Sequence, residues 1–473
     1  MSTFIWRASS KLKLVALGFV VFTVGCHSKS ATNTPPSQTT SATTQAQPIA
    51  PLSANDVSWL FPAPTTTADL ANLIAVKDIT VSGGPVWTDA VFQQFIGIAN
   101  SSFTQVAGTT SQISLPQEAR SIDAWFVAGV RIDAGAPGLS KEIAAQYGQL
   151  PEIRLIIQPI VKNPDGSPKP LDIAGHLIFD FITQTPDPSL QGTDCLRRPV
   201  ADMVAFRPVI ADIAALRTKL ANGQLGGHAV LTNGAPIGVH PGLADPTTAN
   251  AVRSAMLAIL ESRLRAQDLH SMAIAGLPAG AGAPWIFLSM TLMQPGELPS
   301  LPNGGFAPVP GPTLDKGEFA QMLNPASAKT RVVPEPATNN LNPITCRNAA
   351  VSPTSLPVAQ RKGVSTSAVF VTPPSPAETK NILDTIADPQ KSFFFNTDCI
   401  SCHTETQRTM TLLNVTAIPG INQADLPSTQ YDVRNFGWGA GKAGMQSTVT
   451  RRAANETTAV VTFINSNLLS NQK

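Results

Sequence analysis

The chain has 473 residues, of which 43% are hydrophobic and 14% are charged, and its formal net charge is +2. This length is sufficient for two or three domains, each with its own apolar core. The near-balanced charge, together with the lack of a basic run interleaved with aromatic residues, argues against a nucleic acid as partner.

The first residues have the pattern of a secretory signal peptide. Arg7, Lys11 and Lys13 precede an uncharged, mostly apolar run that ends at Gly25. At about 1.5 Å per residue this run is too short to cross a hydrocarbon layer of roughly 30 Å as a helix. We therefore predict that residues 1–25 are a signal peptide and that the mature protein lies outside the cytoplasm, on the periplasmic side of a bacterial envelope.

The junction at Cys26, directly after a small glycine, resembles the lipobox of bacterial lipoproteins. In that family the cysteine becomes the lipid-modified first residue, so the resemblance implies a lipid anchor in a membrane at Cys26. Thr23 stands where family members usually carry Leu, and ordinary cleavage with a free Cys26 is the alternative. An Asp directly after the cysteine would resemble an inner-membrane retention signal. His27 stands at this position instead, and its presence favours the outer membrane.

Residues 26–55 are rich in Ser, Thr, Pro and Gln and have no charge after Lys29. Such a segment has too little apolar surface to offset the entropy of ordering it, which predicts a flexible linker. Residues 56–294 then have a mixed, globular composition. Runs rich in β-branched and aromatic residues predict strands at Trp125–Asp133, Ile153–Pro159 and His176–Ile182.

Two helices are predicted after these strands. The first has apolar residues at helical spacing and Gly223 at the expected left-handed C-cap; the apolar residues are Val209, Ile213, Leu216 and Leu220. In the second, Asp245 is expected to cap the first turn and Pro246 to occupy its first position. Early strands followed by helices favour an α+β domain over a doubly wound sheet.

This domain shows no catalytic motif. Its histidines, which are His176, His228, His240 and His270, have no second metal ligand at helix or hairpin spacing. We expect each to be a hydrogen-bonded structural residue, although a metal-binding or basic role stays open. No nucleophile elbow, nucleotide loop or zinc-protease motif is present.

Residues 295–376 are dense in proline, which excludes long helices over most of the segment and favours extended chain. We predict irregular structure that packs on the preceding domain. Cys195 and Cys346 are a candidate disulfide, because an oxidising compartment permits one; two unpaired buried thiols are the alternative.

The most specific motif is Cys399-x-x-Cys402-His403. Two thiols at this spacing can form thioethers to the two vinyl groups of one porphyrin, and the adjoining imidazole can then bind the iron. A redox dithiol, half of a zinc site and chance are the alternatives, but no βαβ pattern or further pair of ligands lies near. The motif predicts one covalent haem c.

Residues 377–473 resemble a class I cytochrome c, because they follow the order short helix, Cys-x-x-Cys-His, long loop, methionine and terminal amphipathic helix. The resemblance implies a small all-α haem domain after the α+β domain. It also implies His403 as proximal iron ligand and Met445 as distal ligand. Phe395, Phe436 and Trp438 are expected to wall the haem pocket.

The distal ligand has several alternatives. Met410 follows His403 closely, and this short tether makes the opposite face of the porphyrin hard to reach. An open site and a histidine from the first domain are the further alternatives. A thioether ligand raises the reduction potential, whereas two histidines usually lower it.

These features predict a one-electron carrier that exchanges electrons with a redox partner protein. Two alternatives are a fused oxidoreductase, in which the first domain acts on a small substrate, and a haem-based envelope sensor or binding protein. A single attachment site argues against a dihaem peroxidase.

Overall fold

The computed structural model describes a large part of the chain, with gaps. The described ranges are 50–81, 84–101, 104–106, 109–111, 113, 115–135, 150–186, 197–276, 285–293, 313–323, 375–392, 399–429 and 432–469. Cys26, Cys195, Cys346 and Phe395 lie outside these ranges, so the predicted lipidation, disulfide and Phe395 wall stay predictions.

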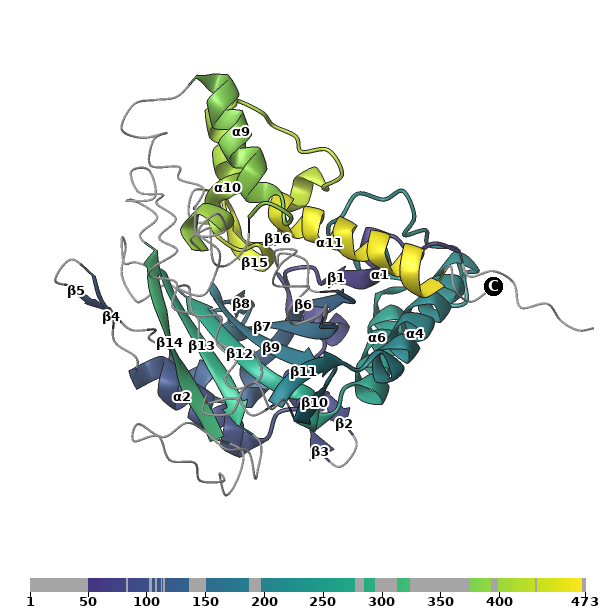
Figure 1. Ribbon diagram of the computed structural model, residues 1–473, viewed down its shortest axis with the longest axis horizontal. Helices are drawn as coiled ribbons and strands as arrows, with labels where there is room; N and C mark the ends of the chain where they lie inside the picture. The colour runs from purple at the N-terminus through teal and green to yellow at the C-terminus, as the bar shows by residue number, and fades with distance from the viewer. Residues whose placement is uncertain are drawn as a thin grey trace, which may run out of the picture. The chain divides into compact units, whose positions relative to one another are not determined.

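An antiparallel sheet forms the centre of the described structure (Figure 1). Its strands are β1 (Ser58–Leu60), β6 (Trp125–Asp133), β7 (Glu152–Lys162), β8 (Pro168–Pro170), β9 (Ile173–Asp180), β12 (Leu269–Gly276), β13 (Trp285–Met293) and β14 (Thr313–Leu323). The spatial order is β1-β6-β7-β9-β12-β13-β14, with β8 paired to β7 off this path. Each neighbouring pair is antiparallel. The molecule is therefore a mixed α+β structure built on antiparallel pairing.

The remaining elements are short hairpins and helices. The hairpins are β2–β3 (Thr80–Val81 and Gly84–Pro85), β4–β5 (Thr104–Val106 and Thr109–Ser111), β10–β11 (Ile182–Pro186 and Arg197–Ala201) and β15–β16 (Phe436–Gly441 and Gly444–Val449). The helices are α1 (Ala54–Val57), α2 (Asp89–Ser101), α4 (Met203–Ala221), α5 (Pro241–Ala244), α6 (Ala249–Arg263), α9 (Pro376–Ala387), α10 (Cys399–Leu412) and α11 (Arg451–Phe463). A π-helical turn, Ile464–Leu469, continues α11.

The predicted strands are present. β6 has the predicted bounds, β7 extends beyond the predicted run at both ends, and the third run is divided between β9 and β10. The prediction that residues 295–376 are irregular is wrong for β14, which pairs with β13. No proline lies within Thr313–Leu323, so every residue of this stretch can donate to the ladder.

The two predicted helices are confirmed as α4 and α6, with one error. Gly223, which has φ +69°, takes the left-handed conformation expected after α4. The predicted start of α6 is wrong: the helix begins at Ala249, and Thr248 precedes it as N-cap residue. Asp245 instead accepts from the backbone N–H of Thr247 in the turn before the helix. Strands β12, β13 and β14 also follow these helices, so the predicted order of strands first and helices later is incomplete.

The C-terminal helices match the predicted order, but the expectation of an all-α segment is wrong. Helices α9, α10 and α11 are joined by a chain that contains the antiparallel hairpin β15–β16. The sequence Phe-Gly-Trp-Gly-Ala-Gly of β15 alternates with period two, which places the glycines on one face of the strand, where neighbouring atoms approach the backbone closely. Met445 therefore lies on strand β16 and not in a loop.

The C-terminal elements belong to the same compact unit as the sheet, which extends over Pro48–Lys473. Phe436, Trp438 and Ile464 share one cluster of buried apolar residues with Trp59 and Phe61. The ends of the unit also meet, because the backbone N–H of Leu52 donates to Oδ1 of Asn465 at 2.8 Å.

Candidate functional site

The Cys-x-x-Cys-His motif forms the start of α10, where residues three positions apart lie on one helix face. The side chain of Cys399 lies outside the described atoms. Cys402 and His403 are half-buried and point to the segment before β15. That segment supplies Asn435 to Cys402 and Val433 to His403.

His403 is oriented by a backbone carbonyl. Its Nδ1 lies 2.7 Å from the carbonyl oxygen of Val433, which can only accept, so Nδ1 carries the hydrogen. Burial lowers the pKa of His403 to about 4, although this hydrogen bond acts in the opposite direction. The imidazole is thus neutral near pH 7, with its lone pair on Nε2. This is the form and the supporting hydrogen bond that metal-binding histidines use.

Cys402 does not have the electrostatics of a reactive thiol. Burial raises its pKa to about 11, against a weaker opposing effect of Arg452. Its Sγ lies 3.9 Å from Nδ2 of Asn435. Redox-active dithiols usually contain a thiol with a lowered pKa. Cys402 itself is therefore not a nucleophilic thiolate near pH 7.

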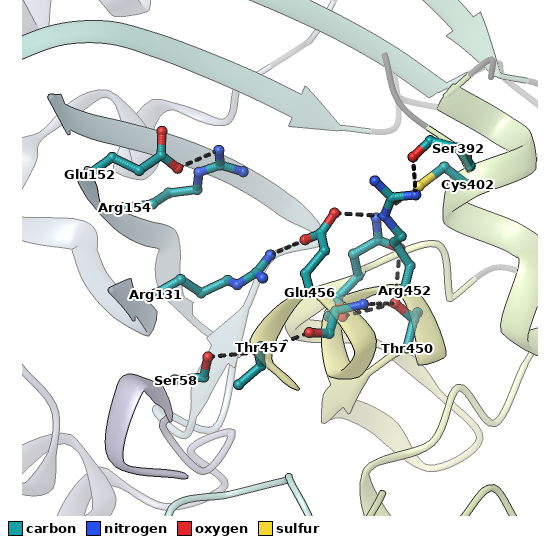
Figure 2. A network of polar contacts seen from close by, with 12 residues as sticks. Ser58, Arg131, Glu152, Arg154, Ser392, Cys402, Thr450, Arg452, Glu456 and Thr457 are labelled. Carbon is teal, nitrogen blue, oxygen red and sulfur yellow. Dashed lines mark hydrogen bonds and ion pairs between the residues drawn. The ribbon is translucent and has the colours of Figure 1, made fainter. Parts of the chain in front are cut away.

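A charged network links α11 to the sheet beside this motif (Figure 2). Glu456 of α11 accepts from Arg131 of β6 and from Arg452, in both cases at 2.6 Å. Arg452 also donates to the carbonyl oxygen of Ser392 at 2.6 Å. Burial would raise the pKa of Glu456, but Arg452 and Arg131 lower it to about 2. Glu456 is therefore a carboxylate that holds both arginines in place.

The sheet presents further charge on the same side. Glu152 and Arg154 of β7 form an ion pair at 2.7 Å. Arg434, just before β15, pairs with Asp172 at 2.7 Å and is almost fully buried. The sequence analysis did not single out these residues. The alternation of charged Glu152 and Arg154 with Ile153 and Leu155 was the available signal, because it marks one polar face of the strand.

The predicted pocket walls Phe436 and Trp438 are buried where the hairpin meets the sheet. An added Cβ at Gly129 of β6 would lie 2.8 Å from the Phe436 ring, so the ring covers this glycine. The backbone N–H of Trp438 donates to Oε1 of Gln158 at 2.7 Å, and its indole N–H donates to the carbonyl oxygen of Phe61 at 2.9 Å. Both aromatic residues thus fix the hairpin to the sheet.

The two methionines considered as distal ligands lie in different places. Met445 pairs with Ala440 at one end of the hairpin. At the other end Val449 pairs with Phe436, which follows Asn435, the residue that contacts Cys402. At about 3.3 Å per residue, the strand between Val449 and Met445 spans roughly 13 Å. Met410 lies on α10 itself and packs half-buried against the apolar cluster.

Three of the domain histidines have structural partners. His228 forms an exposed pair with Asp245 at 2.6 Å. His240 precedes α5 and accepts from the backbone N–H of Gly242, and burial lowers its pKa to about 3. His270 lies 3.6 Å from Asp180. The fourth, His176, lies on β9 in the middle of the sheet.

No family model, curated protein or solved structure matches this chain. Among the described residues, no helix is both long and apolar enough to span a bilayer.

Proposed function

We propose that the chain is a c-type cytochrome that transfers single electrons through one covalently bound haem. The observation that supports this most directly is the hydrogen bond from His403 to the carbonyl oxygen of Val433. It fixes the tautomer and ring orientation that an iron ligand needs, next to the half-buried Cys402. In this proposal Cys399 and Cys402 bind the porphyrin covalently and His403 is the proximal ligand.

The haem, when bound, would supply the redox chemistry, in which its iron gains or loses one electron between the ferric and ferrous states. The chain's own residues orient the imidazole through the carbonyl oxygen of Val433 and hold it half-buried against the segment before β15. Helices α9, α10 and α11 keep the order of a class I cytochrome c, with β15–β16 between the last two. We infer that this segment is the haem-binding part of a larger α+β unit that contacts a redox partner protein.

Expression with a cytochrome c maturation system tests the proposal. A reduced-minus-oxidised spectrum of the denatured, purified chain is expected to show haem that stays attached. The variant Cys402→Ser is expected to lose one of the two thioethers, with a corresponding shift of the haemochrome band. A wild-type chain without attached haem under these conditions would contradict the proposal.

Cell-envelope attachment is a separate proposal that rests on the sequence around Cys26. We expect the Cys26→Ser variant to move from the membrane fraction to the soluble periplasmic fraction with its haem unchanged. Fractionation of cells that express both forms checks this. Retention of the variant in the membrane fraction would show that Cys26 is not the anchor.

A further inference from the structure

His176 lies on the face of the sheet that the C-terminal segment covers. It is directly opposite Ile156 of β7 and Ala273 of β12, and Ile156 in turn is opposite Gly129 of β6. Directly opposite residues in an antiparallel sheet point to the same side. Phe436 covers Gly129 on that side, so the His176 side chain points toward the layer that contains α10, β15 and α11.

Short contacts lead from His176 to the haem-binding motif. An added Cβ at Gly437 would lie 3.2 Å from Cγ2 of Ile156, the cross-strand neighbour of His176, and 3.5 Å from Cδ of Arg434. Arg434 follows Val433, whose carbonyl oxygen accepts from His403.

The electrostatics of His176 agree with this position. Burial lowers the pKa of His176 well below its usual range, and Arg154, Arg434 and His403 lower it further.

The surface of the sheet around His176 is only partly covered. His176, Ile178 and Ala273 are half-buried, although they lie on central strands. Their neighbours on the opposite face, such as Leu177 and Phe179, are fully buried. Ala273 offers little side-chain bulk beside His176. Helix α10 also contacts β14 at the far side of the sheet, so β9 and β12 lie between the two places where the C-terminal segment meets the sheet.

Arg154 provides a complementary charge at this surface. It lies directly opposite Ile178, which is two residues after His176 on the same face of β9. Its guanidinium pairs with Glu152. Its Nε is buried and has no hydrogen-bond acceptor among the described residues. A buried donor without an acceptor is costly, and a carboxylate is its strongest partner. The two propionate groups of a haem are carboxylates.

We propose that His176 is the distal iron ligand, so that the haem lies between α10 and the sheet with His403 and His176 on opposite faces, and that Arg154 binds a propionate. This inference rests on the proposed function, because it requires the haem. It assigns β9 to the cofactor site and gives the large domain a direct part in setting the potential. Met445, the ligand implied by the family resemblance, is the rival.

The test compares three variants of the full-length holoprotein by optical and electron paramagnetic resonance spectroscopy of the ferric state. Wild type is expected to be low-spin without the far-red band of methionine ligation. His176→Ala is expected to become high-spin, to bind carbon monoxide when reduced, and to return to low-spin on addition of imidazole. Met445→Leu and the control His270→Ala are expected to keep the wild-type spectrum.

A far-red methionine band in wild type, or a high-spin Met445→Leu with an unchanged His176→Ala, would overturn the assignment. If His176→Ala does not fold, His176→Met provides the second readout: it is expected to gain the methionine band and to raise the potential. An unchanged spectrum in His176→Met would also overturn the assignment. Haem attachment in the wild type is measured first. If haem is attached and the ligand tests fail, only the assignment of His176 is wrong; if no haem is attached, the proposed function itself is wrong.

Discussion

At the scale of single residues, Glu456 connects the C-terminal segment to the sheet. Its carboxylate is largely buried and accepts from both Arg131 and Arg452. Removing one partner of a buried ion pair leaves the other charge uncompensated, at a cost of about 3 kcal/mol or more. We expect Glu456→Gln to lower the free energy of unfolding by about this amount in urea titrations. The matched control is Asp123→Asn, which breaks the exposed pair with Lys77 and is expected to change little.

The effect of Glu456 should depend on pH in one direction. Its pKa in the folded chain is about 2, below the ordinary value of 4.5. A lowered pKa stabilises the folded state fully above the ordinary value, and this stabilisation is lost as the pH falls through the folded pKa. We expect the difference in unfolding free energy between wild type and Glu456→Gln to shrink between pH 4.5 and pH 2. A constant difference over this range would show that the carboxylate charge is not responsible.

At the scale of elements, hairpin β15–β16 depends on glycines for its close packing. An added Cβ at Gly439 would lie 1.9 Å from Oδ1 of Asp432, a residue that is itself buried and accepts from Thr448. Forcing a methyl group into such a contact typically costs about 1–3 kcal/mol. We expect Gly439→Ala to destabilise the chain by that amount in thermal or urea unfolding. Gly97→Ala, in an exposed and open position of α2, is the control and should be neutral or slightly stabilising.

The elements also show how far sequence patterns can predict this structure. β6 was predicted with its bounds because Trp125–Asp133 has a continuous β-rich composition between turns. The start of α6 was misplaced because Asp245 can cap either a turn or a helix. The Cys-x-x-Cys-His spacing predicted that Cys402 and His403 belong to one site. Sequence patterns could not single out His176 among the four histidines of the first domain, because its neighbourhood depends on Gly437 packing against Ile156, far away in the sequence.

At the scale of the whole molecule, the sheet and the C-terminal segment have one core. Gln158 of β7 is fully buried, and both ends of its amide bond the backbone of Trp438. Ser58 of β1 lies 2.9 Å from Thr457 of α11, oxygen to oxygen. These contacts join parts of the chain that the sequence analysis assigned to separate domains. A protein whose apolar core is shared in this way is expected to unfold as one cooperative unit.

Two probes can test this cooperativity in the holoprotein. Tryptophan fluorescence reports mostly on the sheet, where Trp59, Trp87, Trp125 and Trp285 lie, with Trp438 as a further contribution from the C-terminal segment. The Soret band of the proposed haem reports on the surroundings of His403. We expect both signals to change with the same midpoint and slope in a urea titration, because neither part retains its packed surface when the other unfolds. Glu456→Gln should shift both midpoints together, since its two arginines lie on the two sides of the interface. Loss of the Soret signal at a lower urea concentration, with fluorescence unchanged, would instead identify residues 377–473 as an independently folding haem domain.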